Sequence, residues 1–96
     1  MRSPRMIKFN LDMCIALNDI KRLNNGERPI KNTHRLALII ETRYELDYER
    51  IKDQMYKAQK TGYQQHDKVE GIEGLINNIC AVLNTTREDL IQEIEQ

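Results

Sequence analysis

The chain has 96 residues, with 15 basic and 15 acidic side chains, and aromatic residues make up 5% of it. This length allows one small domain, and so few aromatic residues favour stabilisation by self-association. No apolar run approaches the roughly 20 residues of a membrane span, and the first residues lack the apolar core of a secretory signal. We therefore expect a cytoplasmic protein that does not enter a membrane.

The net charge is zero, but the charges are unevenly distributed. Residues 1–35 carry eight basic and three acidic side chains, whereas residues 36–96 carry seven basic and twelve acidic ones. A basic end of this kind is typical of a chain that binds an anion. Head-to-tail self-association is the alternative explanation.

The first predicted element is a short strand over residues 6–12. Apolar and polar residues alternate strictly from Ile7 to Met13, which is the pattern of a half-buried strand. The alternative is that part of this segment already belongs to the first helix, which would then start at an Asn10 cap.

Two helices are predicted next. An apolar stripe predicts a helix over residues 13–24, and the Asn-Gly pair at 25–26 ends it. Residues 33–60 contain no Gly or Pro and predict one long helix, capped by Asn32 or Thr33. The stripe of the first helix consists of Met13, Leu17, Ile20 and Leu23.

The long helix is too long for a compact chain of this size. Its 28 residues span roughly 42 Å, whereas a 96-residue globule is about 32 Å across. Residues 36–40 are apolar almost all round, as in a helix that is buried on several sides. The helix must therefore break, project or be completed by another subunit. We favour completion by another subunit, and so expect an obligate homodimer or a larger oligomer such as a tetramer.

Residues 61–96 predict a helical extension. Thr61 and Gly62 end the long helix, Asp67 starts the next one, and Thr85 and Glu88 form a capping box for a last short helix. The last helix would carry Leu90, Ile91 and Ile94. The middle helix has an apolar seam that we expect to form a second association surface: Val69, Ile72, Ile76, Ile79 and Leu83.

The predicted fold class is mainly α. A short strand and two helices would form a dimerisation module at residues 1–60, and residues 61–96 would form an oligomerisation extension. An all-helical bundle is the alternative architecture.

No pattern in the sequence points to catalysis. The chain lacks a Gly-rich phosphate loop, a Ser-His-Asp grouping and His or Cys residues at zinc spacing. Cys14 and Cys80 have apolar neighbours and are expected to be reduced core residues, while His34 and His66 are expected to be solvated. We therefore expect no enzyme, no metal and no cofactor.

The order strand, helix, loop, helix over residues 6–50 resembles the ribbon-helix-helix DNA-binding fold. Arc-type repressors and the accessory proteins of plasmid-transfer relaxosomes have this fold, and Lys8-Phe9-Asn10-Leu11 is similar to their strand. In that family, polar side chains of a two-stranded ribbon enter the major groove. The resemblance implies that Lys8 reads guanine and Asn10 reads adenine.

The resemblance also implies a phosphate site at the start of the second helix, which is Asn32 and Thr33 here. Lys31 and Arg35 flank it, although acids are the usual residues at a helix N-terminus. The predicted DNA-binding residues are therefore Lys8, Asn10, Lys31, Asn32, Thr33 and Arg35.

The predicted function is that of a small oligomeric DNA-binding regulator, either a transcriptional repressor or a relaxosome accessory protein. The alternative is a small helical regulator or inhibitor that binds a protein partner through its apolar helix stripes. A helical oligomer that sequesters nucleotides is a third possibility, since it would also use the basic end.

Overall fold

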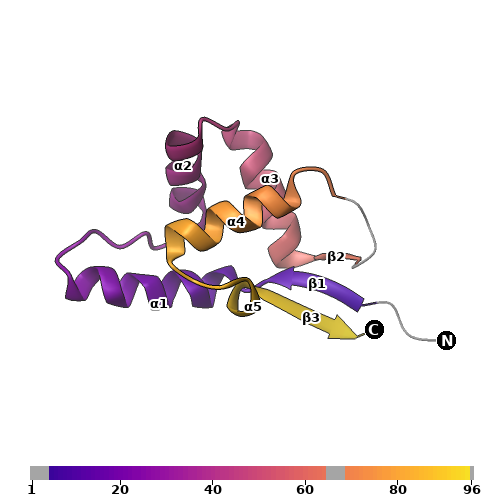
Figure 1. The fold of residues 1–96 in the computed structure, drawn as a ribbon, viewed down its shortest axis with the longest axis horizontal. Helices are drawn as coiled ribbons and strands as arrows, with labels where there is room; N and C mark the ends of the chain where they lie inside the picture. The colour runs from indigo at the N-terminus through magenta and orange to yellow at the C-terminus, as the bar shows by residue number, and fades with distance from the viewer. Residues whose placement is uncertain (1–4, 65–68, 96) are drawn as a thin grey trace.

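The computed structural model describes residues 5–64 and 69–95, and within them five helices and three short strands form a mainly helical fold. The mainly α class is therefore confirmed. Figure 1 shows the elements, which follow one another as β1 (Arg5–Phe9), α1 (Leu11–Asn24), α2 (Thr33–Tyr44), α3 (Tyr48–Lys60), β2 (Tyr63–Gln64), α4 (Ile72–Leu83), α5 (Arg87–Leu90) and β3 (Ile91–Glu95).

The sheet joins the two ends of the described chain. β1 is the middle strand in the order β2-β1-β3, and both neighbours run antiparallel to it. The longer pairing extends from Arg5 opposite Glu95 to Phe9 opposite Ile91. The predicted N-terminal strand is confirmed, but it ends three residues earlier than expected. Ile91 and Ile94 belong to β3 and not to a helix, so this part of the prediction is wrong.

Asn10 marks an abrupt change from strand to helix. It stands at the N-cap of α1, and its backbone N–H donates a hydrogen bond to the carbonyl oxygen of Leu90 at 2.7 Å. Both interpretations of this segment are therefore correct in part, because residues 5–9 form a strand and the helix starts directly after Asn10.

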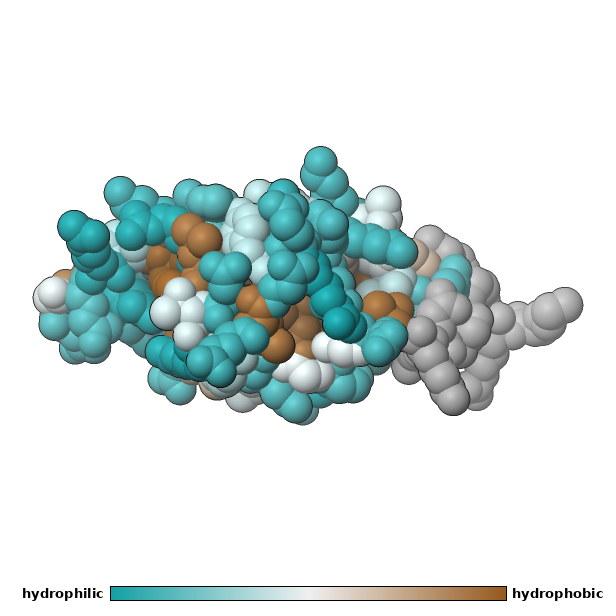
Figure 2. All heavy atoms as spheres, turned by 90° about the horizontal axis from the view of Figure 1, so that it is seen from above, coloured by the Kyte–Doolittle hydropathy of each residue, from teal (hydrophilic) through white to brown (hydrophobic). Residues whose placement is uncertain are grey.

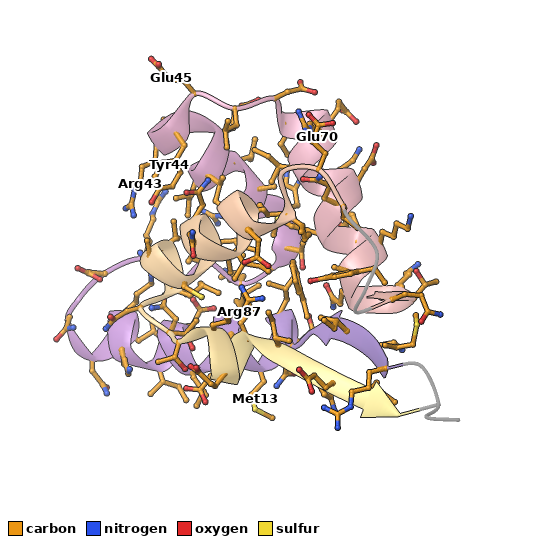
Figure 3. The ribbon with its side chains drawn as sticks, turned by 45° about the vertical axis from the view of Figure 1, so that its right-hand side comes forward. Met13, Arg43, Tyr44, Glu45, Glu70 and Arg87 are labelled. Atoms are coloured by element: carbon orange, nitrogen blue, oxygen red, sulfur yellow. The ribbon has the colours of Figure 1, made fainter. Side chains whose placement is uncertain are left out.

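α1 has two apolar sides, and only one of them faces the core. Leu11, Cys14 and Ile15 are buried together with the amide of Asn18. The stripe that predicted the helix lies on the other side, and Figure 3 shows Met13 projecting away from the other helices. Its four side chains are more than half exposed: Met13 (57%), Leu17 (55%), Ile20 (57%) and Leu23 (61%).

The single long helix predicted over residues 33–60 is wrong, because the chain breaks into α2 and α3. Glu45 adopts the left-handed conformation at φ 55° and ψ 47°, which ends α2. Asp47 then caps α3, and its carboxylate accepts a hydrogen bond from the backbone N–H three residues later at 3.2 Å. The carboxylate of Glu41 accepts a hydrogen bond from the backbone N–H of Tyr48 at 3.2 Å. These acceptors satisfy N–H groups that the break exposes.

The break lets α2 and α3 pack against each other inside one chain. Leu36 and Ile40 of α2 are fully buried in the same cluster as Ile51 and Met55 of α3. Leu36, Ala37 and Ile40 at the apolar start of α2 are therefore covered within the chain, without the second subunit that we expected to complete it, whereas Leu38 is 40% exposed.

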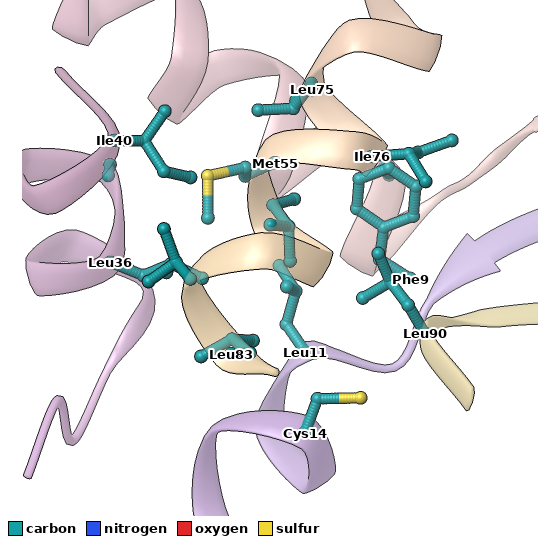
Figure 4. Packing of buried hydrophobic residues seen from close by; sticks show 14 of the residues in the cluster. Phe9, Leu11, Cys14, Leu36, Ile40, Met55, Leu75, Ile76, Leu83 and Leu90 are labelled. Atoms are coloured by element: carbon teal, nitrogen blue, oxygen red, sulfur yellow. The ribbon is translucent and has the colours of Figure 1, made fainter. Parts of the chain in front are cut away.

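α4 supplies the centre of this core, as Figure 4 shows for Ile76 and Leu83. The expected association seam is thus buried between helices of the same chain, so this prediction is wrong. Residues 1–60 and 61–96 share one core cluster. The exposed fractions of the seam residues that are buried are Ile72 (7%), Ile76 (0%), Ile79 (0%) and Leu83 (2%).

The remaining helix ends are set locally. Gly26 and Gly62 have positive φ at the expected stops of α1 and α3. Thr86 caps α5 by accepting the N–H of Asp89, one residue later than the predicted capping box. Asp67, the expected start of the fourth helix, lies outside the described residues.

Glu45→Gly is expected to increase the free energy of unfolding by about 0.5–1 kcal/mol, because the relief of left-handed strain outweighs the entropy that glycine adds to the unfolded chain. Urea unfolding followed by circular dichroism measures the change. In a continuous helix over residues 33–60, the same substitution would decrease stability by about 1 kcal/mol. Glu45→Ala is the control, since alanine keeps the strain.

A chain of residues 1–60 is expected to lack a cooperative thermal transition, because it loses α4 and β3 and leaves Leu36 and Met55 exposed to water. Differential scanning calorimetry is the measurement. A sharp two-state melt of this fragment would show that the first sixty residues have a core of their own.

Candidate nucleic-acid interface

α2 and α3 are consecutive helices that pack in one core cluster and are joined by a short turn, which is the element order of a helix-turn-helix unit. The three residues 45–47 join the two helices, and the turn passes through the left-handed conformation of Glu45. Figure 3 shows Glu45 at the tip of this turn, at the outer edge of the molecule. Helix-turn-helix units have turns of three to four residues, often with glycine, and their second helix enters the major groove of DNA.

The outer face of α3 is polar and is not used by the core. The helix is anchored by the buried residues Ile51, Met55 and Ala58. Tyr56 is 41% exposed on the opposite side. This outer face combines three lysines, two acids and one tyrosine: Glu49, Lys52, Asp53, Tyr56, Lys57 and Lys60.

Contacts around Tyr48 tie the start of α3 to the start of α2. The Tyr48 hydroxyl is hydrogen-bonded to Nδ1 of His34, and the two rings meet edge to face with centroids 5.5 Å apart. The ammonium of Lys52 lies 5.6 Å from the centroid of the Tyr48 ring and 3.0 Å from the carboxylate of Glu49. The hydrogen bond to Glu49 raises the pKa of Lys52, so this lysine stays charged.

The structure places the predicted residue Lys8 in the sheet and Asn10 directly after it. Lys8 is half-buried in β1 and stands opposite Gln92 of β3. The side-chain N–H of Asn10 lies 3.5 Å from the sulfur of Met13. A ribbon made by two copies of β1 needs a free strand edge, and here β2 and β3 pair with the two edges of β1.

The other four predicted residues lie together at the start of α2. Asn32 caps the helix as expected, and its Oδ1 accepts the backbone N–H of Arg35 at 2.9 Å. Thr33 is 7% exposed, and its hydroxyl donates to Oε1 of Gln59 at 3.3 Å. The side chains of Lys31 and Arg35 remain accessible there, so the structure separates the six residues into two groups.

The outer face of α3 was missed because the helix break was missed. Asp47 followed by Glu49 is an acidic helix start that could have revealed the break, since aspartate is a strong N-cap.

Neither cysteine offers an activated thiol. Cys14 is buried and Cys80 is half-buried, both are free, and burial raises the pKa of each thiol. Within residues 5–64 and 69–95, no group of three or more His, Cys, Asp or Glu side chains is arranged to hold a metal ion. No helix in this part of the chain has the length and apolar character needed to cross a membrane.

Comparison with known proteins gives no match to this chain among protein-family models, curated proteins or solved structures.

Proposed function

We propose that the protein binds duplex DNA and that α3 lies in the major groove. The observation that carries this proposal is the α2–α3 unit, in which a three-residue turn with left-handed Glu45 joins two mutually packed helices. Its second helix has an outer face that the core does not use. In helix-turn-helix proteins, this second helix reads the base sequence.

In this proposal, the N-terminal part of α3 contacts bases and its later turns contact phosphates. Base edges are contacted from the N-terminal part of a recognition helix, where Glu49, Lys52 and Asp53 lie. Carboxylates accept hydrogen bonds from the amino group of cytosine, and lysine donates to guanine. Lys57 and Lys60 lie one and two turns further on, and contact the phosphate backbone in this arrangement.

The proposal keeps the DNA target expected from the sequence and moves the reading element from β1 to α3. The occupied edges of β1 favour this change, because a ribbon with a second copy would first have to displace β3 or β2. A strand pairing that also closes the core is costly to open.

Lys57→Gln together with Lys60→Gln is expected to weaken DNA binding for all sequences and to reduce the salt slope by roughly 0.9 for each phosphate that is no longer neutralised. Fluorescence anisotropy with a random duplex pool at several salt concentrations measures both quantities. Lys21→Gln on α1 is the control and should leave the slope unchanged. A loss of binding with Lys8→Gln, but not with the double variant, would assign the interface to β1.

Lys52→Ala is expected to relax the sequence preference by about 1–3 kcal/mol at one base pair while non-specific affinity changes little. Selection of bound duplexes from a random pool, followed by sequencing, gives the preference of each variant. If the wild-type chain selects no sequence and its affinity is independent of salt, the DNA proposal is wrong.

A second function is favoured by one specific observation, which is the exposed stripe of α1. We infer that this stripe, Met13, Leu17, Ile20 and Leu23, is a protein-interaction surface and that its first partner is a second copy of the chain. Figure 1 shows α1 along the edge of the molecule farthest from the α2–α3 turn. A partner on α1 would therefore leave that turn uncovered.

The size of the stripe agrees with the centre of a small symmetric interface. Four side chains that each expose on the order of 100 Å² supply about 400 Å² per copy, which is half of the roughly 800 Å² that each partner buries in a stable complex. Surrounding polar residues of α1 would supply the rest. Twofold pairing of two such helices places the same stripe on both sides of the interface.

Leu17→Glu together with Ile20→Glu is expected to convert the protein to a folded monomer, because each charge would be buried without a partner. Sedimentation equilibrium gives the mass. Leu46→Glu is the matched control, because Leu46 is 42% exposed in the α2–α3 turn. A wild-type chain that is monomeric at micromolar concentration would exclude self-association through α1.

A further inference from the structure

A groove of about 580 Å³ lies between the outer face of α2 and the loop that joins α1 to α2. This volume falls within the range of roughly 300–1,000 Å³ for small-molecule sites. Leu38 is 40% exposed on its surface, and Ile39 is half-buried there. Four arginines from three different segments also line it: Arg22, Arg28, Arg35 and Arg43.

The cationic lining of this groove has no acidic counterpart. No carboxylate lines it, and Arg28, Arg35 and Arg43 form no ion pair in the part of the chain that the structure describes. Elsewhere on the surface the chain does pair its arginines, as Arg87 does with Glu73. Figure 3 shows Arg43 reaching outward from the side of α2. The groove is thus lined by guanidinium groups without carboxylate partners among the described residues, and a guanidinium can hold a carboxylate in bidentate geometry.

The loop that forms one wall is held in place by the carboxylate of Asp19 on α1. Its two oxygens accept the backbone N–H groups of Ile30 at 2.6 Å and Lys31 at 2.9 Å. The side chain of Ile30 is 2% exposed and anchors the loop in the core. Arg28 and Pro29 therefore extend from a fixed segment of backbone.

A buried amide orients the first arginine. Nδ2 of Asn18 donates to the carbonyl oxygen of Leu83 at 2.9 Å, and Oδ1 of the same amide accepts from Nε of Arg22 at 2.6 Å. The opposite wall is α2, whose N-terminus is fixed by its Asn32 cap. The arginines thus come from elements whose backbone positions are already set, which reduces the ordering cost of binding.

We propose that this groove binds an organic acid with an apolar body, such as a medium-chain carboxylate. The guanidinium groups hold the carboxylate, and Leu38 and Ile39 cover the apolar chain. Figure 2 shows patches of hydrophobic residues between hydrophilic ones on the face seen from above. A site of this kind would give the protein a small-molecule ligand in addition to DNA.

The test is a titration of the full-length ¹⁵N-labelled protein with sodium decanoate below its micelle concentration. We expect saturable shifts of the backbone amides in residues 28–43. Arg28→Gln together with Arg43→Gln should weaken decanoate binding about tenfold or more, since charge-assisted hydrogen bonds are lost. Lys21→Gln together with Arg50→Gln removes two exposed cations elsewhere and should leave the dissociation constant unchanged.

Leu38→Gln is a second variant that keeps every arginine and should also weaken binding. Thermal unfolding of each variant shows whether it is folded. Two further probes separate charge from apolar contact, because inorganic phosphate lacks the chain and decyltrimethylammonium reverses the charge. Neither phosphate nor decyltrimethylammonium should bind as tightly as decanoate. The proposal would be overturned by amide shifts that are confined to α1, or by an equal loss of decanoate affinity in the control variant. It would also be overturned if either probe bound as tightly as decanoate, or if the Arg28 and Arg43 double variant lost DNA binding but kept decanoate binding.

Discussion

The antiparallel pairing of β1 with β3 is the contact on which the rest of the structure depends, because the five helices of the described residues lie between these two strands along the chain. The hydrogen bond from Asn10 to the carbonyl of Leu90 continues this ladder by one step. Phe9, Leu11 and Leu90 are then buried at the junction, with exposed fractions of 3%, 0% and 0%. The entropy lost on closing a long loop grows only slowly with its length, so a few buried side chains at the junction offset a large part of it.

Two neighbouring polar residues of α1 extend this constraint to the other helices. Asn18 binds the last carbonyl of α4, and Asp19 binds the loop that leads into α2. Both use backbone groups that would otherwise lack partners at a helix end or in a loop. The same two residues therefore fix the walls of the arginine-lined groove and the position at which α2 begins.

The sequence predicted features whose cause is local. The alternation around Phe9, the stop at Gly26 and the cap at Asn32 depend on a few neighbouring residues, and each is present in the structure. The break at Glu45 was missed because the helical stripe continues in phase across it, and because the left-handed position carries Glu where Gly is usual. The proposed recognition face of α3 was missed with it.

Features with distant causes could not be predicted in this way. Residues 91–95 fit the end of a helix as well as a strand, and only pairing with β1 at the other end of the chain decides between them. The side of α1 that faces the core was equally undetermined, because Leu11, Cys14 and Ile15 form an apolar side as convincing as the stripe. Tertiary packing buries the side with Leu11, Cys14 and Ile15, which leaves the stripe on the other side of α1 in solvent.

Charge sets a limit on how this chain could recognise DNA under the proposed function. The chain has no net charge, so long-range attraction to a polyanion is weak, and the first turns of α3 place Glu49 and Asp53 where phosphates would repel them. These carboxylates are acceptable in a major groove only where base amino groups supply hydrogen bonds to them. The energetic balance then favours discrimination between sequences over non-specific affinity, with Lys57 and Lys60 supplying the phosphate contacts. A second copy held through α1 would double those contacts without altering either α3 surface.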